Sequence, residues 1–458
     1  MQFEINLTQQ GQDAKAEVLH TCTLEIDFLA SVPTLGLSLA QGKSILKELQ
    51  AAVVVKQIEQ LAAGERICKH CGRARNLKDY HDIHYRSLFG DVVCRMPRWS
   101  ACRCDVAAEC HVARKRQRWF SAEMEFIQSQ LAATIPYARS ADLLSLLLPV
   151  SKGNAASTVR EHALATGQRL DAQGVVAVTQ PDQLDLRESG GPTIVGLDSG
   201  YVRHSHPDPQ QSCEVVVGRA MKKNYGQRSV AFVRIVDDKA KERMRGMLSH
   251  FGGPEQLLEV FTDGDAALRQ WQQTTLPDSS HVLDWYHLKT RIAKLNSVVH
   301  SRQASKELKP SDHDRISSVA GRLKWRLWHG RSTQVVEGLK SILRMTQRPS
   351  LLEKPVVKFV RKLTRDLIGY LQNNADSLPD YGKRYRSGQR ISSAFVESTV
   401  NQLIDKRMSK SQQMRWDPQS AHQLLQVRVR VVDGQLRDDF SNWYPGFPQN
   451  DSELRLTA

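Results

Sequence analysis

The feature that most constrains the fold is the order of short apolar segments between residues 190 and 285. Five of these segments predict strands: 194–197, 213–217, 229–236, 257–261 and 282–283. Two stretches between the later strands have helical spacing: 239–249 and 266–273. Three strands joined by short connections, followed by alternating helices and strands, predict a mixed sheet with helices on its faces.

Acidic residues end two of these strands, and a third acidic residue lies in a helical pattern far downstream. Asp198 closes the first strand, Asp263 closes the fourth, and Glu397 lies within 391–400. Ligand sites in α/β sheets gather at the carboxyl ends of strands, and hard divalent cations take carboxylate ligands. Taken alone, each Asp is equally suited to shaping a turn, and Glu is ordinary on an exposed helix. Their joint arrangement favours a metal site.

Two further carboxylates rival Asp263 as the second ligand. Asp265 follows it by two residues, and Asp284 follows the fifth strand. Asp284 and His287 are three residues apart at a predicted helix start, so that their side chains face one another. Asp284 is also placed to cap that helix, with His287 a bystander. In the functional interpretation, His287 orients a phosphate or the carboxylates.

Positive charge is concentrated in one stretch of the chain. The formal net charge is +15, and residues 288–390 carry 23 Lys and Arg against eight Asp and Glu. This stretch therefore carries the whole excess of positive over negative charge in the chain. An ordinary charge run is a solvated helical face, but a whole segment of one sign favours a nucleic acid partner.

The cysteines are clustered, with five of the eight between Cys68 and Cys104. Hydrophobic residues make up 40% of the chain and charged residues 25%, without an apolar run of 18 residues. This composition and the N-terminal sequence predict a cytosolic protein with reduced thiols and no membrane segment. Clustered cysteines in such a protein indicate a metal rather than disulfides.

Two cysteine pairs lie about 30 residues apart, on either side of a predicted hairpin with its turn at Gly90-Asp91. The predicted zinc ligands are Cys68, Cys71, Cys102 and Cys104. Four thiolates on two turns are typical of a zinc ribbon, in which the metal supports folding rather than catalysis. The second pair is one residue shorter than usual, so that Cys94, Cys110 and His111 are possible substitutes. The alternative is a set of small buried thiols.

Residues 138–170 have the pattern of a helix–turn–helix, with the turn at 149–153. On the second helix, Thr158, Arg160 and His162 are the candidates for contacts with DNA phosphates and base edges. Helix pairs are common packing units, which is the alternative interpretation.

Two tryptophans in the basic stretch are interleaved with cations. Trp325 and Trp328 are three residues apart, next to Lys324 and Arg326. Tryptophan at helical spacing usually packs in a core, whereas the neighbouring cations favour stacking on nucleic acid bases.

The sequence resembles the DDE-type transposases of bacterial insertion sequences, of the ISKra type, which are similar to Mutator-like transposases. The resemblance covers roughly residues 40–440. It rests on six motifs: Val195–Gly200, Thr262–Ala266, His281–His287, Ala394–Asn401, Lys406-Arg407 and Met414–Trp416. It implies an RNase H-like core (β-β-β-α-β-α-β) in which Asp198, Asp263 and Glu397 bind two Mg²⁺ or Mn²⁺ ions. It also implies that His287 assists catalysis.

The expected fold is a multidomain α+β and α/β protein in which an all-helical insertion interrupts the RNase H-like mixed sheet. The predicted segments are an N-terminal helical region (1–65), a zinc-ribbon-like domain (66–112), a helix–turn–helix domain (113–180), the first part of the catalytic core (192–287), the basic insertion (288–390), the C-terminal core helices (391–440) and a tail (441–458).

The resemblance implies a homo-oligomer on DNA that binds the inverted repeats of its element, cuts strands and joins them to target DNA. Such a protein is cytoplasmic and associated with the nucleoid. Two alternatives remain: an RNase H-like nuclease that does not join strands, and a DNA-binding protein with an inert core. The three intact carboxylates favour activity.

Overall fold

The computed structural model describes residues 2–10, 16–26, 32, 35–104, 119–174, 191–205, 212–253, 257–409 and 414–448. Cys110 and His111, the alternative zinc ligands, lie outside these residues. The chain divides into two compact units: unit 1 (residues 1–169 and 434–458) and unit 2 (residues 170–433). Within the described residues, no helix combines the length and apolar character needed to cross a membrane.

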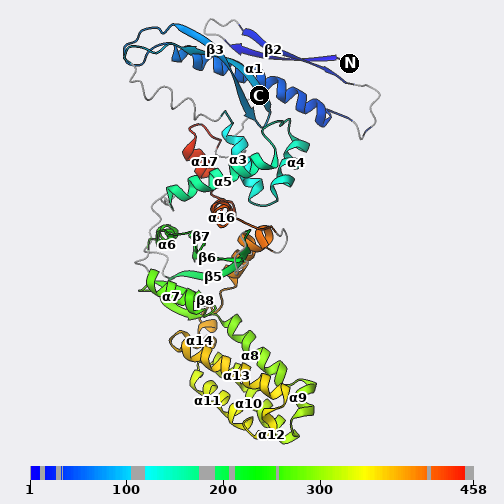
Figure 1. Cartoon of the computed structure of the whole chain (residues 1–458), viewed down its shortest axis with the longest axis vertical. Helices are drawn as coiled ribbons and strands as arrows, with labels where there is room; N and C mark the ends of the chain where they lie inside the picture. The colour runs from blue at the N-terminus through cyan, green and yellow to red at the C-terminus, as the bar shows by residue number, and fades with distance from the viewer. Residues whose placement is uncertain are drawn as a thin grey trace. The chain divides into compact units, whose positions relative to one another are not determined.

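Unit 2 contains a five-stranded mixed sheet (Figure 1). Its strands are β5 (Thr193–Arg203), β6 (Ser212–Lys222), β7 (Gly226–Val233), β8 (Leu258–Thr262) and β9 (Ser280–Leu283). The spatial order is β7-β6-β5-β8-β9. The first three strands pair antiparallel, whereas β5, β8 and β9 pair parallel. Helices α6 (Ala240–Ser249) and α7 (Ala266–Thr275) alternate with the later strands. The predicted element order and mixed sheet are confirmed.

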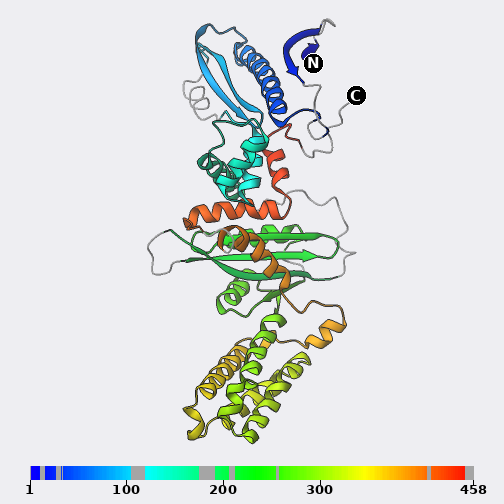
Figure 2. The ribbon, with the colours of Figure 1, turned by 90° about the vertical axis from the view of Figure 1, so that its right-hand side faces the viewer.

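Helices cover both faces of this sheet, as Figure 2 shows. On one face, α6 and α7 pack over side chains such as Leu197 and Val216. The other face carries α15 (Ala394–Val400), the π-helix η3 (Asn401–Ser409) and α16 (Pro418–Val432). Because successive strand residues point to opposite faces, Asp198 lies on the α15 side and Leu197 on the α6 side.

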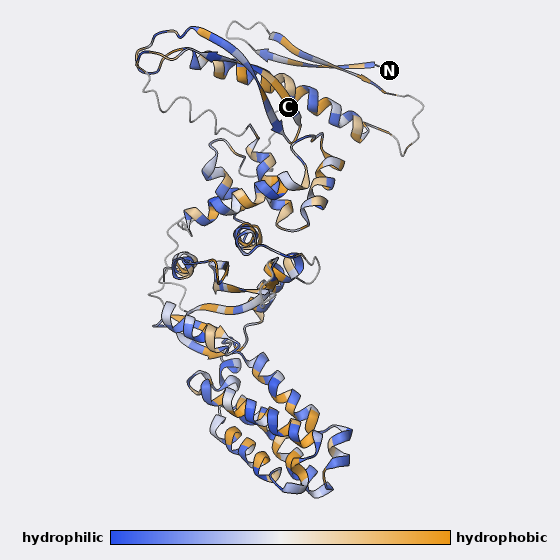
Figure 3. Cartoon of the chain, in the orientation of Figure 1, coloured by the Kyte–Doolittle hydropathy of each residue, from blue (hydrophilic) through white to orange (hydrophobic). Residues whose placement is uncertain are grey.

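The basic segment folds as a separate helical bundle within unit 2. Its helices are α8 (Trp285–Val299), α9 (Arg302–Glu307), α10 (Pro310–Trp328), α11 (Ser332–Met345), α12 (Pro349–Leu352), α13 (Pro355–Asn373), the 3₁₀ turn η2 (Ala375–Ser377) and α14 (Tyr381–Arg386). Leu323, Leu339 and Val360 lie in its own apolar core. In Figure 3 these helices carry hydrophobic residues on one side and hydrophilic residues on the other. The all-helical prediction is confirmed.

Unit 1 begins with a hairpin that the sequence analysis does not predict. Strands β1 (Gln2–Gln10) and β2 (Ala16–Glu25) pair antiparallel before helix α1 (Leu39–Glu65). The helical assignment of residues 1–65 is therefore wrong for the hairpin. Most described side chains of both strands are exposed, and Cys22 is the buried one among them. Phe3, Ile5 and Leu7 nevertheless alternate with polar residues, which is the sequence signal for a strand that was missed.

The predicted central hairpin of unit 1 is present as β3 (Leu77–Ser87) and β4 (Gly90–Trp99). Its turn is Leu88-Phe89, because Ser87 pairs with Gly90. The predicted turn at Gly90-Asp91 is thus two residues too late. Gly90 has a φ of +115°, a backbone conformation that glycine adopts without strain.

Three helices follow: α3 (Ala122–Ala132), α4 (Tyr137–Leu147) and α5 (Ala156–Gln173), of which α5 belongs to unit 1 up to Arg169. Helix α17 (Leu436–Trp443) returns to pack against α3, where the rings of Phe126 and Phe440 have centroids 5.4 Å apart. Residues 434–440 therefore belong to unit 1, and the prediction that the core helices extend to residue 440 is wrong. The physical reason is that Phe440 of α17 packs against Phe126 of α3, so that this helix belongs with unit 1.

Candidate functional site

Asp198 lies inside strand β5, so the prediction that it ends a strand is wrong. The strand continues to Arg203 because β6 still pairs with it, from Val217 opposite Asp198 to Ser212 opposite Arg203. The neighbouring strand β8 ends at Thr262, before this point. Asp198 is therefore half-buried beside the open end of β8 rather than at the end of its own strand.

Two glycines bring helix α15 close to Asp198. Gly196 and Gly200 share the strand face of Asp198, because each lies two residues away. A Cβ on Gly196 would lie 2.8 Å from Val396 Cβ, and one on Gly200 would lie 2.7 Å from Ile404 Cδ1. A larger residue at either position would push α15 and η3 away. The sequence Gly-x-Asp-x-Gly is the signal for this contact that the sequence analysis missed.

Asp263 follows β8 directly and lies level with Asp198. Strands β5 and β8 pair in parallel up to Gly196 opposite Phe261, and continuing this register by two residues places Asp198 opposite Asp263. The hydroxyl of Tyr370 on α13 donates to the backbone carbonyl of Asp263 over 2.6 Å. Tyr370 thus fixes the strand end, a role that the sequence analysis missed.

Gly264 shapes the turn after Asp263. Its φ is +83°, and a Cβ there would lie 2.7 Å from Leu283 Cδ1 and 2.9 Å from Tyr370 Cε2. Both the backbone conformation and the lack of space require glycine. The carboxylate of Asp263 accepts a hydrogen bond of 2.9 Å from the amide of Asp265.

The electrostatics of Asp198 reveal its neighbours. The pKa of its carboxyl is raised to about 6, chiefly by burial and in smaller part by the negative charges of Asp263 and Glu397. The Ser199 amide, which donates to Oδ1 over 2.8 Å, and the nearby His287 oppose this rise. Asp263, His287 and Glu397 are thus within electrostatic range of Asp198, although they come from the end of β8, α8 and α15.

The carboxylates are less tightly clustered than the cysteines of unit 1. Among the described residues, the groups whose ligand atoms all lie within 4.8 Å of one another do not include Asp198, Asp263 and Glu397. A single ion would therefore contact all three only after side-chain rotation. The donor set itself, three carboxylates with Glu397 exposed, suits hard divalent cations.

Both rival carboxylates have other partners. Asp265 caps α7 by accepting hydrogen bonds from the amides of Ala267 and Leu268 at 2.9 and 3.1 Å. Asp284 is buried and caps α8 through the amide of Tyr286. Its second oxygen accepts hydrogen bonds from the amide and hydroxyl of Ser393. Asp284 thereby ties the start of α8, with His287, to the residue that precedes α15, with Glu397.

We expect Asp198→Asn to stabilise the metal-free protein at pH 8. The raised pKa means that Asp198 contributes stability below about pH 4, and that this contribution is lost as pH rises through about 6. The gain in unfolding free energy at pH 8 should be on the order of 2 kcal/mol, and it should vanish near pH 4. Urea unfolding in EDTA at pH 4 and pH 8 measures this difference in unfolding free energy.

Asp265→Asn is the matched control, because Asn also caps a helix. Equal destabilisation by Asp198→Asn at both pH values would contradict the prediction.

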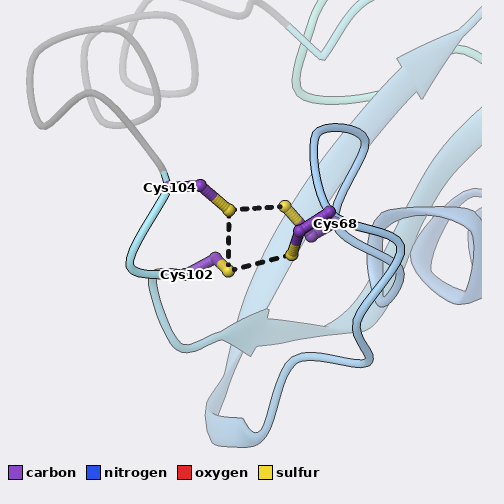
Figure 4. A group of neighbouring side chains, drawn as sticks. Cys68, Cys102 and Cys104 are labelled. Atoms are coloured by element: carbon purple, nitrogen blue, oxygen red, sulfur yellow. Dashed lines mark hydrogen bonds between the residues drawn. The ribbon is translucent and has the colours of Figure 1, made fainter.

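Unit 1 contains the second candidate site, a cluster of four cysteines that is able to hold a zinc ion. The sulfur atoms of Cys68 and Cys104, and those of Cys71 and Cys102, are 3.5 Å apart, and those of Cys102 and Cys104 are 3.1 Å apart. Figure 4 shows the sulfur atoms pointing toward one another from two turns. The predicted four-cysteine set is thus brought together despite the short spacing of its second pair.

The backbone of the turn that carries Cys68 and Cys71 favours metal binding. The backbone bridge between Ile67 and Ala74 closes it, and Gly72 takes a φ of +68°. Hydrogen bonds from the amides of Cys71 and His70 lower the pKa of the Cys68 thiol to about 6, which favours the thiolate that binds zinc. Cys94 is instead buried among Val54, Ile58 and Ile83, and burial raises its pKa. The alternative in which Cys94 is a ligand is wrong.

The DNA contacts predicted for the helix–turn–helix are partly wrong. His162 is 3% exposed, hydrogen bonded to Gln128 and packed against Phe120. It belongs to the core because α3 covers its face of α5. Arg160 is exposed and Thr158 half-buried on the same helix, and their DNA contacts stay a prediction.

The two tryptophans of the insertion have different environments. Trp328 packs against the Trp285 ring, with centroids 5.1 Å apart, and against Gly382. The prediction that it stacks on bases is wrong, because α14 and α8 occupy its face. Trp325 is 53% exposed under the guanidinium of Arg331. Lys324 is exposed, whereas Arg326 is half-buried and donates to the Gln334 carbonyl.

No protein-family model matches the chain, and a search of curated proteins finds no match.

Proposed function

We propose that this chain is a DNA transposase with an RNase H-like core, which cuts the ends of its element and joins them to target DNA. The observation that carries the proposal is that Asp198 lies within electrostatic range of Asp263, Glu397 and His287, which come from three other segments. The strand order β7-β6-β5-β8-β9 and the helical bundle between the second and third carboxylates support it. The resemblance to ISKra-type and Mutator-like transposases supports the same assignment.

Asp198, Asp263 and Glu397 would hold Mg²⁺ or Mn²⁺, which supplies activation of the attacking oxygen and stabilisation of charge at the phosphodiester. The amides of Ser199 and Asp265 orient the first two carboxylates, as their hydrogen bonds of 2.8 and 2.9 Å indicate. Glu397 is exposed, so that it would be accessible to the DNA substrate. His287 is half-buried near Asp198, where it would hold a phosphate oxygen.

The helical bundle would bind the DNA on which these residues act. Residues 288–390 carry 23 cations against eight acidic residues, and DNA binding by such a surface releases counterions. Trp325 and Lys324 are exposed on α10 and would contact DNA. In unit 1, Arg160 on α5 is a second candidate for phosphate contacts.

The test uses full-length protein, Mg²⁺ and labelled duplexes that carry the DNA flanking the coding sequence, together with a supercoiled target. Joined products would support the proposal. Cut products without joining would identify a nuclease, and binding without cutting would identify a DNA-binding protein; either outcome would overturn it. Reactions in EDTA control for contaminating metal-dependent activity.

We expect Ser393→Ala to lower cleavage without lowering DNA affinity. The Ser393 hydroxyl and amide both donate to Asp284, and losing the hydroxyl loosens the start of α15 and hence Glu397. A roughly tenfold loss of rate and a higher half-saturating Mg²⁺ concentration should follow. Ser392→Ala is the matched control, since its hydroxyl lies 3.5 Å from the same carboxylate. An unchanged Mg²⁺ dependence in Ser393→Ala would contradict the positioning role.

A further inference from the structure

The N-terminal hairpin of unit 1 contacts helix α1 through a polar cluster. Cys22, which is 2% exposed, is the buried residue of this hairpin within its described parts. His20 lies two residues earlier on β2 and therefore on the same face of the strand. An isolated two-stranded hairpin is marginally stable in water, so this small contact needs a strong interaction.

Helix α1 supplies a carboxylate to the cluster. Glu48 Oε2 lies 3.2 Å from His20 Nε2, and Glu48 Oε1 accepts a 3.1 Å hydrogen bond from the Ser44 hydroxyl. A ligand atom from each of His20, Cys22 and Glu48 lies within 4.8 Å of the other two. Imidazole, thiol and carboxylate are the three side-chain types that zinc takes most often.

We propose that His20, Cys22 and Glu48 form a second zinc site, which fastens the β1–β2 hairpin to helix α1. Thiolate and imidazole favour zinc over Mg²⁺ or Ca²⁺. The thiolate and carboxylate charges together balance Zn²⁺, and the thiol proton of Cys22 leaves to solvent on binding. The side chains of His20 and Glu48 are 35% and 44% exposed, which leaves room for water as the fourth ligand.

Comparison with another group of metal-ligand residues in the same chain supports the assignment of zinc to His20, Cys22 and Glu48. A third group, Asp171, Asp237 and His422 in unit 2, is equally close-set. The guanidinium of Arg243 lies in it, hydrogen bonded to both aspartates and near His422. A cation therefore already balances that group. Among the described residues, the hydrogen-bonding partners of Glu48 in this cluster are His20, Cys22 and Ser44, none of which is a lysine or arginine.

The experiment measures zinc per chain in full-length protein after equilibration with zinc and desalting. Cys22→Ser and Cys68→Ser should each hold one zinc fewer than wild type, because they remove different sites. Glu48→Gln keeps a hydrogen-bonding partner for His20 and should raise the zinc dissociation constant at least tenfold. Glu59→Gln, on the same helix and paired with Lys56, is the matched control and should retain the wild-type value.

Amide exchange keeps the proposal testable if Cys22→Ser folds poorly. Zinc should slow exchange of residues 17–25 in wild type and in Glu59→Gln, but not in Glu48→Gln. Wild-type zinc content in both Cys22→Ser and Glu48→Gln would overturn the proposal and leave a hydrogen-bonded cluster. Zinc loss in Cys22→Ser with an unchanged dissociation constant in Glu48→Gln would also overturn the three-ligand site.

Discussion

Asp198→Asn should reduce DNA strand cleavage by roughly a thousandfold or more, because the site loses the carboxylate that lies within electrostatic range of both Asp263 and Glu397. Asn keeps the size of the side chain and removes a charge that is costly to bury. The loss of activity should therefore coincide with a fold that is as stable as wild type or more stable. Gel analysis of labelled end DNA in Mg²⁺, with binding measured separately, checks both points.

The matched controls for this prediction come from the turn after β8. Asp263→Asn should lose cleavage as severely as Asp198→Asn does. Asp265→Asn should retain it, since Asp265 caps α7 and Asn is equally good at that position. If Asp265→Asn lost cleavage and Asp263→Asn kept it, the second ligand would be Asp265 rather than Asp263.

Cys68→Ser should remove zinc from the four-cysteine cluster and unfold the segment around it. Structural zinc contributes roughly 10 kcal/mol or more to the folding of small zinc domains. The turn from Ile67 to Ala74 and the turn of Cys102 have little apolar core of their own, because Cys71 and Cys104 are exposed. We expect rapid proteolysis of this region and loss of the cobalt–thiolate absorption band in the Co²⁺-substituted protein.

Cys94→Ala separates zinc binding from cysteine burial. Cys94 packs with Val54 and Met96 under α1, so its truncation should cost about 1–2 kcal/mol of unfolding free energy while the zinc content stays unchanged. Loss of zinc in Cys94→Ala, or full retention of the cobalt–thiolate band in Cys68→Ser, would contradict the ligand assignment. A chelator should reproduce the Cys68→Ser phenotype in wild type.

Much of the fold follows from local sequence patterns. The alternation of apolar segments between residues 193 and 283 predicts the strands and helices of unit 2, and the helical spacing of 288–390 predicts the bundle. The β1–β2 hairpin was missed, although Phe3, Ile5 and Leu7 alternate with polar residues in the pattern of a strand. Few of its side chains are buried, and Cys22 is the one buried residue among its described positions. Its contact with α1 depends on Glu48, which lies 26 residues after Cys22.

Site prediction fails wherever burial decides the role of a residue. His162 and Trp328 occupy positions at helical spacing that suit DNA contacts, yet α3 covers the first and α8 with α14 the second. Cys94 has the same chemistry as the four clustered cysteines, but faces an apolar core. Sequence spacing predicts which side chains share one face of a helix or strand. The elements that pack around it determine whether that face is buried or exposed.

The sequence by itself determined which chemical groups are available: four clustered cysteines, a basic helical segment and carboxylates on or directly after strands. The tertiary structure decided which of them meet. Asp265 and Asp284 resemble Asp263 in sequence context, but each caps a helix by accepting hydrogen bonds from backbone amides at the helix start. Gly196 and Gly200 let α15 approach β5, and this contact brings Glu397 within range of Asp198 from about 200 residues away.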